Sequence, residues 1–171
     1  SFKDYLNKIP LLFVIRDMPG VEMWIRSELE RIGVSNFFIH VIDSPTRGQA
    51  DTVAIALRAL GLNGKLTVFN IDTFLKKFCV SESLSMCDGY LEVFLSEGNH
   101  WSFVEPGRDN VVVRTTEKER ISDHCSNGLY YFSDCQVFLS VFDDYASLMS
   151  GAGRELYIAP IYNLMIQRGM D

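Results

Sequence analysis

The sequence predicts an α/β fold in which a mixed β-sheet is flanked by helices. Two observations favour it: apolar runs alternate with helical periodicities up to residue 72, and short strand-like runs separated by turn residues follow. The chain has 171 residues, of which 47% are hydrophobic and 22% are charged, in the ordinary globular range. We therefore expect residues 1–171 to form a single domain.

The N-terminal part has a β-α-β-α-β pattern. Three apolar runs bounded by charged or turn residues predict buried strands, and the periodicities between them predict two helices, the first closed by a glycine at position 33. Short connections between such elements favour a parallel, doubly wound arrangement. The expected strands are 9–17, 36–43 and 65–72, and the expected helices are about 21–32 and 50–60.

Beyond residue 72 the pattern changes. Short runs separated by Gly, Pro, Asn and Asp predict antiparallel strands or a mixed extension of the sheet. Two helical periodicities follow, the second starting near Pro160, a residue suited to a first helical turn. The expected strands are 89–95, 100–106, 110–119 and 128–132, and the first of these helices is about 134–148.

The charge balance excludes some classes of partner. A formal net charge of −6 and a pI near 5.1 argue against a nucleic-acid-binding surface and against an anionic-membrane surface. No signal peptide or bilayer-length apolar stretch is found, and the four cysteines lack zinc-ligand spacing. We therefore expect a cytoplasmic protein with reduced thiols; the sequence leaves its oligomeric state open.

The first candidate site is the strand-to-helix junction "SPTRGQADT" at 44–52. Helix starts offer unpaired N–H groups to a phosphate or a base edge, Gly48 would let a ring approach the backbone, and the Gln49 amide both donates and accepts. A structural alternative is that Thr46 and Gln49 form a capping box, which explains Gln49 without any ligand.

The second candidate is "NID", where Asn70 and Asp72 follow a predicted buried strand. A carboxylate at the carboxyl end of a strand is well placed to hold Mg²⁺ against a nucleoside triphosphate, because Mg²⁺ often uses one or two carboxylates plus phosphate oxygens. The alternative is a turn that simply ends the strand, since Asn and Asp are common there.

Two further candidates lie downstream. Lys118, beside Glu117 in "TTEKERIS", could neutralise a substrate phosphate, or could belong to a solvated hairpin end. Trp101, in "HWSFV", could line an acceptor pocket, or could pack against the sheet. No serine or cysteine nucleophile motif is present.

Taken in order, several blocks resemble the nucleotidyltransferase family, and in particular its bacterial branch in capsule and lipopolysaccharide biosynthesis. The resemblance covers about residues 36–165, and the order of the blocks is more specific than any one of them. It implies a Rossmann-like, glycosyltransferase-A-type fold and transfer of a nucleoside monophosphate from an NTP to a phosphorylated sugar or similar acceptor, with release of pyrophosphate. The blocks are "DSPTRGQADTVAIAL", "LTVFNIDTF", "GYLEVF", "HWSFV", "TTEKERIS", "GLYYF" and "ELYIAPIYN".

The resemblance also assigns roles to residues. It implies base contact by Gly48 and Gln49, a Mg²⁺ ligand at Asp72, and an acceptor-phosphate contact by Lys118 with Glu117 beside it. We group Asn70 with the nucleotide-binding residues and Trp101 with those that bind the acceptor. CTP is the favoured donor, by analogy with cytidylyltransferases of small phosphates.

The sequence departs from the family in two places. The glycine-rich loop with a basic residue that wraps the triphosphate is not found, and a second metal carboxylate is expected beyond "ELYIAPIYN". We therefore expect a fragment of a longer domain that lacks its first β-loop-α unit. A non-catalytic nucleotide- or sugar-phosphate-binding module remains the alternative. A metal-dependent glycosyltransferase ranks third, because "NID" lacks the first Asp of a DxD motif and "FDDY" lies in a predicted helix.

Overall fold

The structure, a computed structural model, describes residues 5, 7–73, 86–151 and 153–171. The described residues divide into two compact units, one reaching Thr46 and the other beginning at Arg47. The secondary structure confirms the predicted α/β class with mixed strands and flanking helices.

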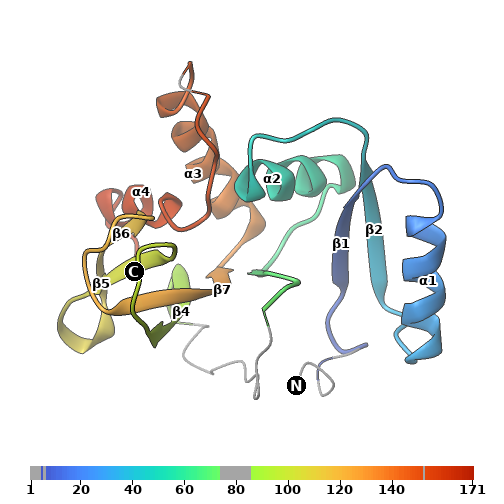
Figure 1. Ribbon diagram of the computed structural model, residues 1–171, viewed down its shortest axis with the longest axis horizontal. Coiled ribbons are helices and arrows are strands. Elements are labelled where there is room, and N and C mark those ends of the chain that lie inside the picture. The colour runs from blue at the N-terminus through green and yellow to red at the C-terminus, as the bar shows by residue number, and fades with distance from the viewer. Residues whose placement is uncertain (1–4, 6, 74–85, 152) are drawn as a thin grey trace. The chain divides into compact units, whose positions relative to one another are not determined.

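The first unit is a β-α-β motif. Its strands pair in parallel, with Leu11 opposite Phe37 at one end of the ladder, and α1 runs alongside them (Figure 1). Gly33 follows the helix with a φ of 79°, in the left-handed conformation predicted for the end of this helix. The three elements are β1 (Leu11–Arg16), α1 (Val21–Arg31) and β2 (Phe37–Ile42).

The second unit is a five-stranded sheet with three helices. Four strands follow the spatial order β3-β7-β5-β6, and β4 also pairs with β7. Its elements in chain order are α2 (Gln49–Leu60), β3 (Leu66–Phe69), β4 (Gly89–Leu95), β5 (Ser102–Pro106), a short 3-10 turn (Arg108–Asn110), β6 (Val112–Glu117), β7 (His124–Phe132), α3 (Cys135–Leu148) and α4 (Ile161–Gln167).

The predicted parallel pairing of strand 65–72 is wrong. The strand ends earlier, at Phe69, and pairs antiparallel with β7, where Leu66 lies opposite Phe132. A short apolar run marks a buried strand but carries no information about the direction of its partner. Here the partner comes from about sixty residues downstream, beyond the reach of local patterning.

β7 is longer than predicted and contains a bulge. It begins at His124. The prediction began this strand at Gly128, because it took the glycine as a strand boundary. Opposite β7, Leu91 of β4 pairs with Tyr130 and Val93 with Ser126, so three residues of β7 face one residue of β4. Gly128 lies in this extra segment with a φ of 86°, as expected for a glycine in a bulge.

The core lies where α3 and α4 pack on the sheet. The ring of Phe132 contacts those of Phe138 and Tyr162, with centroids 5.0 and 5.1 Å apart. The Tyr162 hydroxyl lies 2.8 Å from the carbonyl oxygen of Tyr90 and 2.9 Å from that of Tyr131, so α4 is attached to two strands. Burying each large apolar side chain contributes about 1.5–3 kcal/mol, which holds these elements together.

Two further observations concern the helices and the cysteines. Within the described ranges, every helix is too short or too polar to cross a bilayer. Cys87, Cys125 and Cys135 form no disulfide with one another, while Cys79 lies outside the described residues.

Candidate functional site

Gly48 stands immediately before α2, where the chain passes close to a second backbone segment. Ala50 N–H donates to the carbonyl oxygen of Leu156 at 3.0 Å, and Leu156 N–H donates to that of Arg47 at 2.6 Å. A Cβ on Gly48 would lie 2.6 Å from the Leu156 oxygen, and its φ of 137° is one that other residues rarely adopt. The glycine is therefore required by backbone contact within the protein, while its contact with a base stays a prediction.

Gln49 is the first residue of α2, and the predicted capping box with Thr46 is wrong. The N-cap is Gly48, which is two residues later than the capping box requires. The Gln49 side chain instead turns toward the end of β3, where its Nε2 donates to Oδ1 of Asn70 at 2.5 Å. Two predicted nucleotide-binding residues, 21 positions apart, are thus brought into direct contact.

Asn70 is fixed in turn by Gly128. A Cβ on Gly128 would lie 2.5 Å from Nδ2 of Asn70 and 2.7 Å from its Cγ, so the Asn70 amide occupies the space that the glycine leaves. Gly128 is buried, and Asn70 and Gln49 are partly buried. The bulge of β7 therefore sets the position of Asn70, and Asn70 sets the orientation of the Gln49 amide.

Asp72 lies in a turn just past β3. Thr73 N–H donates to the carbonyl oxygen of Asn70 at 3.2 Å, and the Asp72 side chain is exposed. The predicted turn is thus present, and it presents the carboxylate to solvent. Within the described residues no three acidic, His or Cys side chains cluster around a metal position. A single accessible carboxylate still fits Mg²⁺, which binds mainly to water and substrate phosphates when protein ligands are few.

Glu117 and Lys118 lie at the end of β6, in the same unit. The Ser102 hydroxyl donates to the Glu117 carboxylate. Burial raises the pKa of Glu117, and this effect outweighs the opposing hydrogen bond from Ser102 and the charge of Lys118. Lys118 has a φ of 58°, and its backbone N–H donates to the Trp101 carbonyl oxygen at 2.9 Å. The backbone turns sharply here, and the Lys118 side chain is exposed.

The Lys118 side chain is held by Tyr157. Its Nζ donates to the Tyr157 hydroxyl at 2.7 Å and lies 4.8 Å from the centroid of the Tyr157 ring. The same hydroxyl donates to the carboxylate of Glu155. The hydrogen bond with Tyr157 raises the pKa of Lys118, and the hydrogen bond with Glu155 raises the pKa of Tyr157. The three groups form one hydrogen-bonded chain.

Trp101 packs against its neighbours. Its ring meets Phe94 edge-on with centroids 5.0 Å apart and lies 4.4 Å from the His100 ring, while Nε1 donates to the Glu97 carbonyl oxygen at 3.2 Å. These contacts match the packing interpretation of the residue. Contact between Trp101 and an acceptor stays a prediction. The Trp101 carbonyl oxygen accepts a hydrogen bond from the backbone N–H of Lys118.

One segment links the two groups of predicted residues. Leu156 is hydrogen-bonded to the chain around Gly48, and the next residue, Tyr157, holds Lys118. A few residues on, Asn163 of α4 accepts from Thr115 N–H at 2.8 Å and donates to the Thr115 carbonyl oxygen at 2.9 Å. This amide takes the place of a neighbouring strand along β6, two residues before Glu117.

Sequence reasoning missed four residues of this arrangement. Gly128 stood at the start of the predicted strand 128–132, so the pattern did not show the glycine inside a strand that would indicate a bulge. The block "ELYIAPIYN" contains the other three, Glu155, Tyr157 and Asn163. Tyr157 and Asn163 act on partners 39 and 48 positions away, which no local spacing marks, and Glu155 acts through Tyr157.

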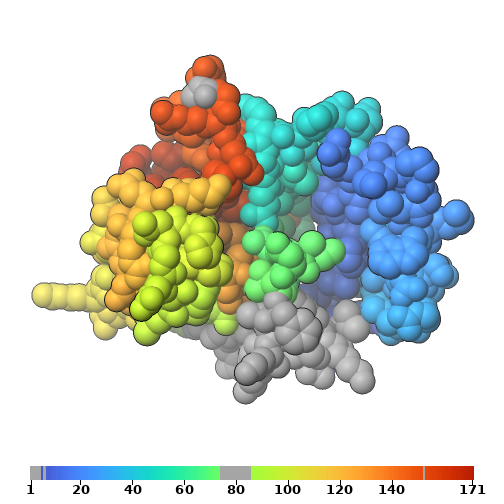
Figure 2. Space-filling view, viewed as in Figure 1, coloured from blue at the N-terminus to red at the C-terminus, as the bar shows by residue number. Residues whose placement is uncertain are grey.

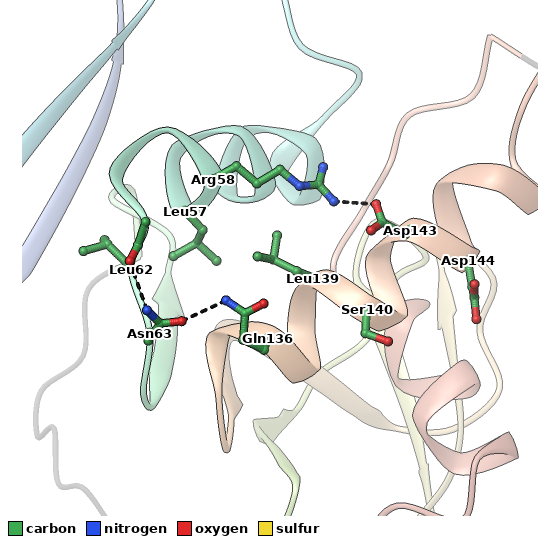
Figure 3. Close-up of a pocket in the computed structure, with 10 residues that line it drawn as sticks. Leu57, Arg58, Leu62, Asn63, Gln136, Leu139, Ser140, Asp143 and Asp144 are labelled. Atoms are coloured by element: carbon green, nitrogen blue, oxygen red, sulfur yellow. Dashed lines mark hydrogen bonds and ion pairs between the residues drawn. The ribbon is translucent and has the colours of Figure 1, made fainter.

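A groove between α2 and α3 does not coincide with the predicted site (Figure 3). It has a volume of about 710 Å³. Four of its polar side chains pair with one another: Arg58 with Asp143 at 2.5 Å, and Gln136 Nε2 with Asn63 Oδ1 at 2.9 Å. Two more, Ser140 and Asp144, are bound by Arg168. Asp143, of the "FDDY" segment, is thus an ion-pair partner on a helix.

Comparison with known proteins identifies the family. No family model and no curated protein matches the sequence. Among solved structures, a nucleoside-diphosphate-sugar pyrophosphorylase of Vibrio cholerae RC9 is 38% identical, with a TM-score of 0.90. The alignment covers 99% of this chain and 73% of that protein. The chain belongs to the nucleotidyltransferase family.

A second solved structure shares the fold of this nucleotidyltransferase. It is a protein of Bacillus anthracis described as a glucose-1-phosphate thymidylyltransferase and solved with a sucrose. It is 19% identical, with a TM-score of 0.64, over 91% of this chain and 64% of that one. The predicted Rossmann-like fold is thus confirmed by both structures, and the predicted nucleotidyltransferase family by the first of them.

Proposed function

We propose that this nucleotidyltransferase transfers a nucleoside monophosphate from an NTP to the phosphate of a phosphorylated sugar or a similar small acceptor, releasing pyrophosphate. The observation that supports it most is the linkage through residues 155–157. Leu156 is hydrogen-bonded to the backbone of Arg47 and Ala50, on either side of Gln49, and Tyr157 is hydrogen-bonded to Lys118. Gln49 forms a neutral amide pair with Asn70, whereas Lys118 is charged. Amides suit the edge of a base, and an ammonium suits a phosphate.

In this proposal the base is read by Gln49 and contacts the backbone at Gly48, next to it at the start of α2. The hydrogen bond to Asn70 leaves Gln49 with a defined amide orientation, so its acceptor and donor face in set directions. A fixed amide discriminates between bases better than a freely rotating one, because it cannot flip to exchange its donor and acceptor. CTP is the donor we favour, by analogy with cytidylyltransferases of small phosphates.

Asp72 is the residue that would hold Mg²⁺. Its exposed carboxylate follows the Asn70 position by two residues, so an ion there lies on the nucleotide side of the site. When bound, Mg²⁺ would supply positive charge to the phosphate oxygens of the NTP.

The chain's own residues then have mainly positioning roles. An oxygen of the acceptor phosphate attacks the α-phosphorus of the NTP, a new P–O bond forms, and the bond to the β-phosphate oxygen breaks to release pyrophosphate. Lys118 holds the attacking phosphate, while Glu117 and Trp101 contact the rest of the acceptor. Because the nucleophile is already an anion, no side chain has to remove a proton.

The product belongs, in this proposal, to surface-polysaccharide precursor synthesis in the cytoplasm. The resemblance to the capsule and lipopolysaccharide branch supports this place. The same resemblance supports reading residues 1–171 as nucleotidyltransferase-like throughout.

The test is pyrophosphate release by the full-length protein with Mg²⁺. CTP, UTP, dTTP, ATP and GTP are each offered with a panel of sugar and amino-compound phosphates. We expect one NTP to be used, and we expect Asp72→Asn to lower kcat/KM by about 100-fold or more, because several kcal/mol of charge stabilisation are lost.

The matched control is Asp109→Asn. Asp109 is an exposed carboxylate in the turn between β5 and β6, at the opposite end of β6 from Lys118. Figure 2 shows the yellow tip of this hairpin projecting from the surface. The control should keep full activity. Absence of release with every pair, while a nucleotide still binds, would favour the binding-module alternative.

A further inference from the structure

We infer that Tyr157 is a positioning residue that places Lys118 for the acceptor phosphate. This inference rests on the function proposed above and extends it to a residue outside the predicted site. Tyr157 contacts Lys118 through its hydroxyl, which lies 2.7 Å from Nζ and places Nζ 4.8 Å from the ring centroid. This hydrogen bond fixes the position of the ammonium beside the hydroxyl end of the ring.

A lysine at this place needs such a restraint. Lys118 is exposed and follows the end of β6. Without Tyr157, the described contacts would hold it there by its backbone hydrogen bond to Trp101 and would leave its side chain free to rotate. A free lysine side chain carries about 2 kcal/mol of rotamer entropy, which is lost when it binds a phosphate. Contact with Tyr157 removes most of that freedom before the acceptor arrives, so less is lost on binding.

The direction of the hydrogen bonds leaves Lys118 available. The Tyr157 hydroxyl donates its proton to Glu155, so its oxygen lone pair faces the ammonium and accepts from it. An ammonium has three N–H donors, and only one is used by Tyr157. The other two can bind phosphate oxygens while the lysine stays on the tyrosine.

The charges favour the same arrangement. Glu155 and Glu117 both interact electrostatically with Lys118, which keeps it protonated. Neither carboxylate is its direct hydrogen-bond partner in the described contacts; the neutral hydroxyl is. A neutral partner holds the ammonium without neutralising the positive charge that an incoming phosphate needs.

The experiment separates acceptor binding from nucleotide binding. In the full-length protein, Tyr157→Phe keeps the ring and removes the hydroxyl. We expect KM for the acceptor to rise about three- to tenfold, the loss of one hydrogen bond to an exposed charged group. KM for the NTP and kcat should stay within about two-fold. Inorganic phosphate, used as a competitor of the acceptor, should inhibit less well by the same factor.

Two further variants exclude a general structural effect. Glu155→Gln keeps an acceptor for the Tyr157 proton and should raise the acceptor KM by less than Tyr157→Phe does. Tyr90→Phe, a partly buried tyrosine of β4 that is not among the site residues, should leave both KM values unchanged.

The outcomes distinguish this inference from the proposed function. If the wild type releases pyrophosphate and Tyr157→Phe leaves the acceptor KM unchanged while Lys118→Ala raises it, the role of Tyr157 is refuted and the function stands. A rise in both KM values by the same factor also refutes it, since that marks a structural role. If the wild type releases no pyrophosphate with any pair, the function and this inference fall together.

Discussion

The two halves of the candidate site are built by different means. Around Gly48, Gln49, Asn70 and Gly128 the groups are neutral and partly or fully buried, and their positions follow from missing Cβ atoms. Around Lys118 the groups are charged and more exposed, and a hydrogen-bonded chain through Tyr157 holds them. The first half is fixed by shape and the second by charge, as suits a planar base and a phosphate respectively.

This difference predicts different responses to mutation. The half around Gly48 should lose stability when atoms are added, and its stability should be insensitive to pH. The half around Lys118 should tolerate small changes in shape, but its contribution to stability and binding should depend on pH and salt.

The largest expected effect is that of Gly48→Ala. The new Cβ would meet backbone atoms of Leu156, which cannot rotate away, in a conformation unfavourable for alanine. We expect the free energy of unfolding to fall by more than about 3 kcal/mol. Gly61→Ala, at a φ of 61° with nothing within 4 Å of the new Cβ, should cost only about 1–2 kcal/mol. Denaturant unfolding of both variants measures the contrast; equal losses would show that contact with Leu156 is unimportant.

The next effect is that of Asn163→Leu, which tests what supports the charged half. It leaves both backbone groups of Thr115 without their amide partner, and Thr115 is buried. We expect a loss of about 2–3 kcal/mol in the free energy of unfolding. Asn163→Asp keeps the acceptor for Thr115 N–H but, when ionised, sets a carboxylate oxygen against the Thr115 carbonyl oxygen, so its loss should be smaller at acid pH, where the protonated oxygen can donate, than at neutral pH. An equal loss of the aspartate variant at both pH values would contradict the account.

Gly128→Ala sharpens the comparison at the level of function. The added Cβ would displace the Asn70 side chain, which can move, and so release Gln49. We expect discrimination among the five NTPs to fall about tenfold, the loss of one well-placed hydrogen bond. Gly64→Ala has nearly the same φ, 89° against 86°, with nothing within 4 Å, and controls for backbone strain. Unchanged discrimination in Gly128→Ala would remove Asn70 from base recognition.

The smallest expected effect is that of Glu117→Gln on stability, and it depends on pH. Burial raises the folded-state pKa of Glu117 above its ordinary value, so the folded protein binds this proton more tightly than the unfolded chain does. The resulting stabilisation is complete below the ordinary pKa of a glutamate and is lost as pH rises through the raised pKa.

The glutamine variant lacks this titration. Relative to the wild type, its stability should therefore increase from acid to neutral pH. Thermal unfolding of both proteins at acid and neutral pH measures this. A variant that loses stability relative to the wild type as the pH rises would have the wrong sign. A corresponding series on Gln49→Leu should show no pH dependence.

The sequence predicted the secondary-structure elements better than their surroundings. Apolar runs located β1, β2 and β3, while the roles of Asp72 and Lys118, taken from "NID" and "EK", stay predictions. The direction of β3, the bulge in β7 and the contact of Gly48 with Leu156 were not predictable. Each depends on a partner brought close only by the fold, whereas local patterns carry information over a few residues.

Gln49 illustrates the limit most clearly. Its spacing from Thr46 suggested a capping box, and a local pattern offered no reason to reject it. In the structure the helix starts at Gln49 itself, because the backbone contact at Gly48 sets the helix start, and its amide is then available for Asn70.

The most direct test of the two-half account is a steady-state measurement on Gln49→Ala and Lys118→Ala in the full-length protein. Both KM values are determined for each variant, with the NTP and acceptor that the wild type uses. We predict that Gln49→Ala raises KM for the NTP alone and that Lys118→Ala raises KM for the acceptor alone, each by about tenfold or more. If both variants raise the same KM, or each raises both equally, the division of the site into a base half and an acceptor half is wrong.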